Sequence, residues 1–504
     1  MLVHLDRLRF AALASFIFAL IALHAAHGHW IGDFWEHSAV VRELITHPAH
    51  PRHPLLLADA PHAFANPYAL AVATFGRLSG SSSVIALTVA SLVNLLMLFV
   101  ALVIFVRRFA SGRAATVSFY LLLFMFLLWG REPWEFSGFY HVNVLHHSLA
   151  YPSACALWVS LILLALNGKR VAEERPRLLL IIVPASAFVL LVHPPAFLFV
   201  ATGFAAMALD ARERWKQMLL SASVLVIAAA VALAWPYFPV WELLTGGSAA
   251  FNVNNATMYS EPLWRTFPAV FIGLPLLVLE ARRTRRWVIM AWCAMLVGLY
   301  AFGYVTANYN YGRVIVFVVF LLQFEVAKFA AQLESRLESR GVSWSWPLVT
   351  AAALSVCVAF SARSIVNAAR DIRWGDRTGG GYAFLGRDVG QYDVMMADLR
   401  DGWIAASFGG KLVASQHPLA FIPESDQRAR RDDVRTFFDA ATSQAQRARI
   451  LDRYRVSYVL AARASPADST VVSEDAVRAL GAVTHEDDRF LLVRLNPRSV
   501  AGVR

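Results

Sequence analysis

The sequence contains few charged residues. Asp, Glu, Lys and Arg make up 16% of its 504 residues, whereas a soluble globular protein carries roughly 25%. Hydrophobic residues make up 58%, and the mean hydropathy is +0.51. The shortage of charge argues against an ordinary soluble protein, and it indicates that lipid is the solvent for much of the chain.

Cysteine is also scarce. The three cysteines, Cys155, Cys293 and Cys357, all lie inside apolar runs. This arrangement fits neither a disulfide framework nor a zinc site, so we expect three small core residues. No nucleotide-binding fingerprint is found. The net charge of +11 does not point to nucleic acid, because the positions of the basic residues follow a membrane topology.

Long apolar runs fill the first three quarters of the sequence. About 18 apolar residues in a helix suffice to cross a hydrocarbon core of about 30 Å. By this rule we predict about eleven membrane-spanning helices, at residues 10–27, 84–106, 114–130, 150–167, 178–193, 196–210, 218–236, 266–281, 287–306, 313–331 and 347–367.

The distribution of basic residues supports this topology. Clusters of Arg and Lys fall on every second connection, and the positive-inside bias assigns those connections to the cytoplasm. The N-terminus is then cytoplasmic, and the long connection 28–83 lies on the opposite face. Because the number of spans is odd, the C-terminal tail lies on that face too. In a bacterium this face of the inner membrane is the periplasmic one.

The tail differs in character from the rest of the chain. It begins with a glycine-rich linker, after which polarity rises and short strand-like and amphipathic helical segments alternate. The predicted fold class is therefore an α-helical polytopic membrane protein with a small C-terminal soluble α/β domain. We predict a transmembrane domain at 1–369 and a C-terminal domain at 370–504, with strands at 411–415, 456–462 and 489–495 and helices within 430–454.

An acidic motif lies in the first external connection. The stretch HWIGDFWEHSAVVRELI, residues 29–45, places Asp33 and Glu36 directly after an apolar run. Their spacing puts both carboxylates on one face of a helix. Two interpretations of Asp33 are open. It is either a helix cap that accepts backbone hydrogen bonds, or a general base whose pKa is raised by partial desolvation.

Three arginines on the same face are candidates for binding a phosphate. Arg313 begins a membrane helix on the external side, where the positive-inside bias disfavours arginine. A planar, always-charged guanidinium suits a phosphate group, and snorkelling toward lipid headgroups is the alternative. Arg52 and Arg131 lie in the two long external connections and are further candidates.

Histidines are frequent in these connections. His146 and His147 lead into a membrane helix, where they can protonate an oxygen or help to hold a divalent metal, and a structural role is the alternative. His47, His50 and His53 are separated by prolines that impose an extended path, so we expect them to belong to a structured loop. The sequence does not decide whether a cation such as Mg²⁺ or Mn²⁺ is required.

The order of these features resembles a known family. The acidic motif GDFWEHSAVVREL is followed by a proline-rich stretch and a surface helix over 47–80, then by alternating helices, the helix start NYNYGRV at 308–314, and a soluble tail. This layout, which covers essentially the whole chain, resembles the GT-C superfamily of integral-membrane glycosyltransferases.

The resemblance implies a reaction and a set of partners. The donor is a sugar carried on polyprenyl phosphate, and the acceptor is a hydroxyl of a lipid, a glycan or a protein. Asp33 matches the catalytic acid of the family's first loop, with Glu36 beside it, and Arg313, Arg52 or Arg131 binds the donor phosphate. The sequence has Asp-Phe-Trp-Glu in place of the family's compact acidic pair, which leaves the role of Glu36 and any metal dependence open.

Other functions remain to be separated from this one. A flippase or transporter for a lipid-linked glycan needs polar residues deep within several helices, yet here the helix centres are nearly uncharged. A ligase that moves a whole glycan also uses external Arg and His residues, but with its large loop between late helices. A receptor whose tail binds a partner is a third alternative.

Overall fold

The chain forms two units, each built from segments that are far apart in the sequence. The computed structural model describes residues 2–28, 30–110, 112–131, 133–247, 249–371, 380–463 and 472–496. The transmembrane unit comprises Met1–His27, Thr88–Pro236 and Phe251–Gly375, and the loop–sheet unit comprises Gly28–Leu87, Tyr237–Ala250 and Asp376–Arg504.

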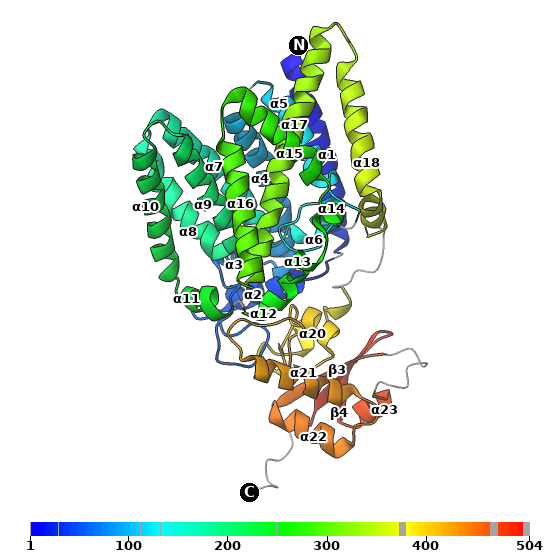
Figure 1. Ribbon diagram of the computed structural model, residues 1–504. Helices are drawn as coiled ribbons and strands as arrows, with labels where there is room; N and C mark the ends of the chain where they lie inside the picture. Colours follow the sequence, from blue (N-terminus) through cyan, green and yellow to red (C-terminus); the bar gives the residue numbers. More distant parts are fainter. Residues whose placement is uncertain are drawn as a thin grey trace. The chain divides into compact units, whose positions relative to one another are not determined.

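Helices fill the first three quarters of the chain (Figure 1). The helices up to residue 371 are α1 (Leu2–His27), α2 (Phe34–Thr46), α3 (Pro67–Ser79), α4 (Ser83–Phe109), α5 (Ala114–Leu127), α6 (Val142–Ser148), α7 (Pro152–Glu173), η1 (Pro176–Leu178), α8 (Leu179–Val192), α9 (Pro194–Asp210), α10 (Arg214–Leu233), α11 (Val240–Glu242), η2 (Leu243–Gly247), α12 (Ala249–Asn255), α13 (Thr257–Ser260), α14 (Leu263–Thr266), α15 (Ala269–Thr284), α16 (Val288–Val305), η3 (Tyr309–Val314), α17 (Ile315–Ser339) and α18 (Ser345–Asp371).

A helix lies over each of the predicted membrane spans. Within the described residues, seven helices are long and apolar enough to cross a membrane, which confirms a multi-pass membrane protein. The helices α5, α8, α9 and α15 have 14, 14, 17 and 16 residues. Because a perpendicular crossing needs about 20 residues, the count of eleven stays a prediction.

Helix α3 shows how local sequence sets the ends of an element. Asn66 precedes it, and the Asn66 side chain accepts a hydrogen bond from the backbone N–H of Ala69 at 3.0 Å. Pro67 takes the first helical position, where its missing N–H is not needed. Gly80 ends the helix with φ = +66°, a left-handed conformation that glycine adopts without strain. The predicted surface helix is therefore confirmed as a helix.

Buried charges join three helices of the transmembrane unit. Arg9 of α1 pairs with Glu334 of α17 at 2.9 Å, and Tyr120 of α5 donates a hydrogen bond to the same carboxylate at 2.7 Å. Arg113 pairs with Asp6 at 2.8 Å. Glu334 is 0% exposed, so its charge depends on these partners. Burying it unpaired would cost several kcal/mol.

The loop–sheet unit contains a mixed five-stranded sheet in the order β2-β1-β3-β5-β4, in which β1 runs parallel to β2 and β3, and β5 runs antiparallel to β3 and β4. Its elements after residue 380 are η4 (Gly380–Tyr382), α19 (Leu385–Asp388), β1 (Val394–Met396), α20 (Leu399–Ala405), β2 (Lys411–Leu412), α21 (Glu424–Phe438), α22 (Gln444–Arg453), β3 (Val456–Ala462), α23 (Glu474–Arg478), β4 (Gly481–Glu486) and β5 (Phe490–Leu495).

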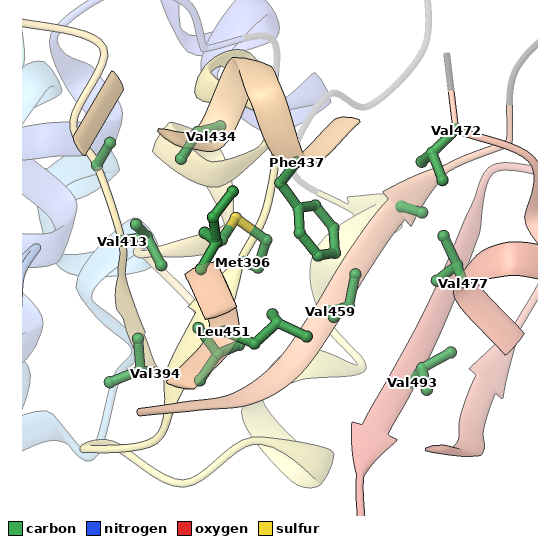
Figure 2. Packing of buried hydrophobic residues seen from close by; sticks show 14 of the residues in the cluster. Val394, Met396, Val413, Val434, Phe437, Leu451, Val459, Val472, Val477 and Val493 are labelled. Carbon is green, nitrogen blue, oxygen red and sulfur yellow. The ribbon is translucent and has the colours of Figure 1, made fainter. Parts of the chain in front are cut away.

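One hydrophobic core holds this sheet to its helices. Met396 of β1, Phe437 of α21 and Val459 of β3 are each 0% exposed and belong to one cluster (Figure 2). The predicted C-terminal α/β fold is confirmed, with β2, β3 and β5 at the predicted strands and α21 and α22 over the predicted helical stretch. Strands β1 and β4 were not predicted.

The first external connection extends the sheet. Leu56 forms a parallel bridge with Leu412 of β2, and the Leu412 N–H donates to the carbonyl oxygen of Leu55 at 2.6 Å. This hydrogen bond and bridge occupy the outer edge of β2. Residues 28–87 thus share a unit with the C-terminal residues, and the division at 369/370 stays a prediction.

We predict that Glu334→Gln destabilises the transmembrane unit by on the order of 3 kcal/mol, because Arg9 then loses the closer of its two buried carboxylate partners. The measurement is the midpoint of thermal unfolding of the purified protein in detergent. Glu213→Gln is the control, since Glu213 forms an exposed pair with Lys216 at 2.7 Å and such pairs contribute little. Equal midpoints for the two variants would contradict the prediction.

Candidate functional site

Asp33 occupies the N-cap position of α2 without capping it. Its side chain makes no cap hydrogen bond to the helix, so the capping interpretation is wrong. The Asp33 Oδ1 atom instead lies 3.6 Å from Nδ1 of His417, and about a third of each side chain is exposed. The carboxylate is therefore accessible from solvent and faces an imidazole from the C-terminal part of the chain.

Glu36 lies one turn further along α2 and is buried. It is 4% exposed, and its Oε1 lies 3.2 Å from Nε2 of His62. Burial raises the pKa of Glu36, but the hydrogen bond and charge of His62, with weaker contributions from His417 and His37, outweigh burial and leave it below its usual value. Asp33 and Glu36, predicted to act side by side, thus have different surroundings.

A buried ion pair joins the same helix to strand β2. Glu43 of α2 and Lys411 of β2 are both almost completely buried, and the Lys411 Nζ atom lies 2.8 Å from Oε2 of Glu43 and 2.8 Å from the carbonyl oxygen of His53. Burial lowers the pKa of Lys411 to about 8, although Glu43 opposes the shift. Burial raises the pKa of Glu43, yet Lys411 and the Arg52 N–H hold it below its usual value.

Sequence reasoning missed this pair and His417. Glu43 carries one signal, because it interrupts the apolar positions Val40 and Leu44 on the buried side of α2. A carboxylate there requires a cationic partner. The sequence gives no indication that the partner is Lys411. His417 lies in a loop without periodicity, and nothing local links it to Asp33.

Arg52 is exposed and lies in the loop–sheet unit together with Asp33. Its guanidinium lies 4.4 Å from the ring centre of Tyr392, a cation–π contact. A small surface pocket is lined in part by Arg52, Glu43, His62 and Tyr237. Arg52 and the histidine that pairs with Glu36 therefore line the same pocket.

The histidines of the first connection serve the fold. The Nδ1 atom of His53 accepts hydrogen bonds from the N–H groups of Leu55 and Leu56 at 3.2 and 3.0 Å, which fixes the turn before the sheet edge. His47 contacts the Tyr392 hydroxyl at 3.0 Å. In the described part of the chain, no three His, Cys, Asp or Glu side chains are placed to hold one metal ion.

The other predicted site residues lie in the transmembrane unit. Arg313 in η3 donates to Oγ of Ser137 at 2.8 Å and to Oδ1 of Asn255 at 3.1 Å, so neutral groups orient its guanidinium. Arg131 is exposed. His147 is buried, and burial together with the charge of His24 lowers its pKa to about 4. The His146 side chain lies outside the described residues.

Solved structures with a similar arrangement of helices and a C-terminal domain identify the fold. The chain aligns with ArnT of Cupriavidus metallidurans bound to undecaprenyl phosphate over 98% of both chains, with a TM-score of 0.54 and 12% identity. The apo form of that ArnT gives 0.52 and 13%, over 96% of both chains. The chain has the GT-C fold. The identities are too low to carry more than the fold.

A second GT-C protein aligns over much of its length. The Archaeoglobus fulgidus oligosaccharyltransferase tethered to an acceptor peptide gives a TM-score of 0.51 and 11% identity, over 89% of this chain and 69% of that one. No family model matches the sequence, and no curated protein matches it. The resemblance inferred from the order of motifs is thus confirmed at the level of the fold.

Lys411→Met is expected to loosen the loop–sheet unit, because Glu43 then lacks its buried cation. Removing one partner of a buried pair costs on the order of 3–5 kcal/mol. Limited proteolysis of membrane vesicles should therefore cleave residues 47–66 on the order of 100-fold faster. Glu43→Gln combined with Lys411→Met should recover part of the resistance, and the exposed Lys216→Met should change nothing. Unchanged cleavage in Lys411→Met would refute a stabilising role.

Acid should open the same unit. Burial lowers the pKa of His37 to about 4 and that of His53 well below its usual value. Between pH 6.5 and 4 the unfolded chain therefore binds protons that the folded chain does not, and stability falls as the pH falls. Glu36 and Glu43, whose pKa values are also lowered, add to the loss below about pH 4.5.

Hydrogen exchange of residues 34–46, corrected for its intrinsic pH dependence, measures this opening. Protection should be lower at pH 5 than at pH 7.5, by up to about 2 kcal/mol from His37 alone, because about 1.5 pKa units of its shift lie above pH 5. His37→Asn should remove that part of the pH dependence. Equal protection at both pH values would show that His37 titrates in the folded chain as it does in the unfolded one.

Proposed function

We propose that the protein is an inverting glycosyltransferase that moves a sugar from a polyprenyl-phosphate donor to an acceptor hydroxyl at the periplasmic face of a bacterial inner membrane. The observation that carries the proposal is the state of Asp33. Asp33 is the N-cap residue of α2, but its carboxylate makes no cap hydrogen bond to the helix. The carboxylate is accessible to solvent, and the buried pair of His62 and Glu36 lies one turn further along. The GT-C fold and the bound undecaprenyl phosphate of ArnT support the class of donor.

The proposed reaction has one displacement step. Asp33 takes the proton of the acceptor hydroxyl, and the oxygen attacks the anomeric carbon from the side opposite the phosphate. The bond between that carbon and the phosphate oxygen breaks, and its electron pair leaves with the polyprenyl phosphate. The configuration is inverted, and the proton on Asp33 passes to solvent. A positioned base of this kind contributes about 10²- to 10⁴-fold to a rate.

The departing phosphate needs positive charge. Among the three candidate arginines, Arg52 lies in the same unit as Asp33. Its guanidinium is held against the Tyr392 ring by a cation–π contact, and Arg52 lines the pocket. We assign it to the donor phosphate, with Arg313 and Arg131 as the candidates of the transmembrane unit. Charge stabilisation of a leaving group is often the largest contribution to catalysis.

Glu36 has a supporting role in this proposal. Its pair with His62 joins the first turn of α2 to the stretch before α3. A buried, satisfied carboxylate is poorly placed to accept a substrate proton, but it fixes the backbone that carries Asp33. His147, which burial keeps neutral, is a candidate hydrogen-bond partner in the other unit.

A second function has one observation in its favour. The aligned oligosaccharyltransferase was solved with an acceptor peptide, and a ligase that transfers a whole glycan would use the same carboxylate. The two functions are separated by comparing transfer from two lipid-linked donors. A glycosyltransferase of the proposed kind uses the donor with a single sugar, and a ligase uses the donor with an oligosaccharide. A flippase predicts instead that donor crosses the vesicle membrane without any transfer.

Asp33→Asn should slow transfer strongly without abolishing it. We expect kcat to fall about 10²- to 10⁴-fold with little change in KM for the donor, because the amide binds no proton. The measurement is sugar transfer from labelled polyprenyl-phosphate sugars in proteoliposomes. Asp59→Asn is the matched control, since Asp59 is an exposed residue of the same loop. Full activity of Asp33→Asn would exclude Asp33 as the base.

A further inference from the structure

The loop around His417 is held rigidly next to the N-terminus of α2. The His417 ring stacks on Trp403, with ring centres 4.2 Å apart and planes 24° apart. Trp403 is 7% exposed and belongs to α20. The stack leaves the edge of the imidazole facing Asp33, whose Oδ1 lies 3.6 Å from Nδ1. His417 is thus oriented by packing before any substrate is bound.

Helix α20 is itself fixed to α2. The Ser407 hydroxyl, just after α20, donates a hydrogen bond to the carbonyl oxygen of Trp35 at 2.9 Å. The rings of Trp35 and Phe408 lie 6.1 Å apart. Both Ser407 and Trp35 are buried. These contacts join the turn that carries Asp33 to the helix that carries Trp403, so the Asp33–His417 geometry does not depend on two exposed side chains alone.

We propose that His417 is a positioning residue of the active site, which holds the Asp33 carboxylate in the orientation in which it takes the proton of the acceptor. The inference rests on the proposed function of Asp33 and adds a part of the C-terminal sequence to the catalytic centre. The sheet and its loops are then part of the enzyme's active site, because they supply the group that orients its base.

The chemistry of the pair supports this role. A distance of 3.6 Å between Nδ1 and Oδ1 is slightly too long for a hydrogen bond. Catalytic hydrogen bonds are often long before substrate binds and shorten in the reacting complex. An Nδ1–H donor at Oδ1 fixes the rotation of the carboxylate. Misplacing a reacting group by about 1 Å costs on the order of 10²-fold in rate, which sets the scale for losing His417.

The first experiment compares variants of His417 by steady-state transfer in proteoliposomes. His417→Ala should lower kcat on the order of 10- to 100-fold and leave KM for the donor unchanged. His417→Asn, whose amide nitrogen can take the place of Nδ1, should restore most of kcat. A structural defect would affect both variants alike, so equal losses in Ala and Asn would overturn the proposal, as would a normal kcat in His417→Ala.

The matched control is a histidine of the sheet in the same unit. His485 of β4 stacks on Phe384, with ring centres 3.7 Å apart, and pairs with Asp487 at 3.0 Å. His485→Ala removes an equivalent stacked histidine–aspartate pair away from Asp33. Its kcat should stay at the level of the unaltered protein. A loss equal to that of His417→Ala would show a general effect on the C-terminal fold and would overturn the proposal.

A double-mutant cycle tests whether His417 acts through Asp33. In the Asp33→Asn background, His417→Ala should cause no further loss of kcat, because the group that it positions is already gone. A further loss of the same 10- to 100-fold would mean that His417 acts independently, and the proposal would be wrong. Residual activity in the background is measured in single-turnover reactions with excess enzyme.

A measurement without turnover separates this proposal from the proposed function. With ¹⁵N-labelled histidine, the ring signal of His417 is assigned by its loss in His417→Ala. Asp33→Asn should shift this signal at neutral pH and leave that of His485 in place. An unmoved signal would show that the two side chains do not interact. If Asp33→Asn transfers sugar normally while the signal shifts, the function of Asp33 fails but the pair stands.

Discussion

The ion pair between Glu43 and Lys411 is the contact on which the loop–sheet unit depends. A lysine ammonium and a carboxylate, both almost fully out of water, are stable there only together. Lys411 uses its remaining hydrogen-bonding capacity on the carbonyl oxygens of His53 and Pro54. The interaction therefore fixes a helix, a turn and a strand at one point. Helix α2 carries Asp33 and Glu36, so the position of the proposed base follows from it.

Around that point the acidic residues of α2 have separate tasks set by their surroundings. Asp33 is accessible and faces His417, Glu36 is buried against His62, and Glu43 is buried against Lys411. The helix and its N-cap thus carry one accessible carboxylate and two buried, paired ones. The separation explains why the motif Asp-Phe-Trp-Glu differs from a compact acidic pair. In the proposed function, its second member supports the backbone of the first.

Local patterns in the sequence carry much of this architecture. Apolar runs and charged connections predict the helices, an Asn-Pro start and a Gly stop delimit α3, and the apolar run at residues 456–462 predicts the buried strand β3. Strand β1 was not predicted because a run of three strand residues is too short to show a periodic pattern. The contacts of Lys411 and His417 escaped because they join residues far apart in the chain, and no local preference encodes a partner at that separation.

The order in which the chain is synthesised determines when the buried pair of Glu43 and Lys411 can form. Residues 28–87 leave the ribosome long before residue 411 exists, and until then the Glu43 side chain has no ammonium to meet and must stay hydrated. The buried arrangement of the first connection around Lys411 can therefore form only after the later spans have been synthesised. The connection's final conformation, and with it any activity of Asp33, arises only once the last strands have been delivered. A chain stopped before the sheet would be inserted in the membrane yet catalytically immature.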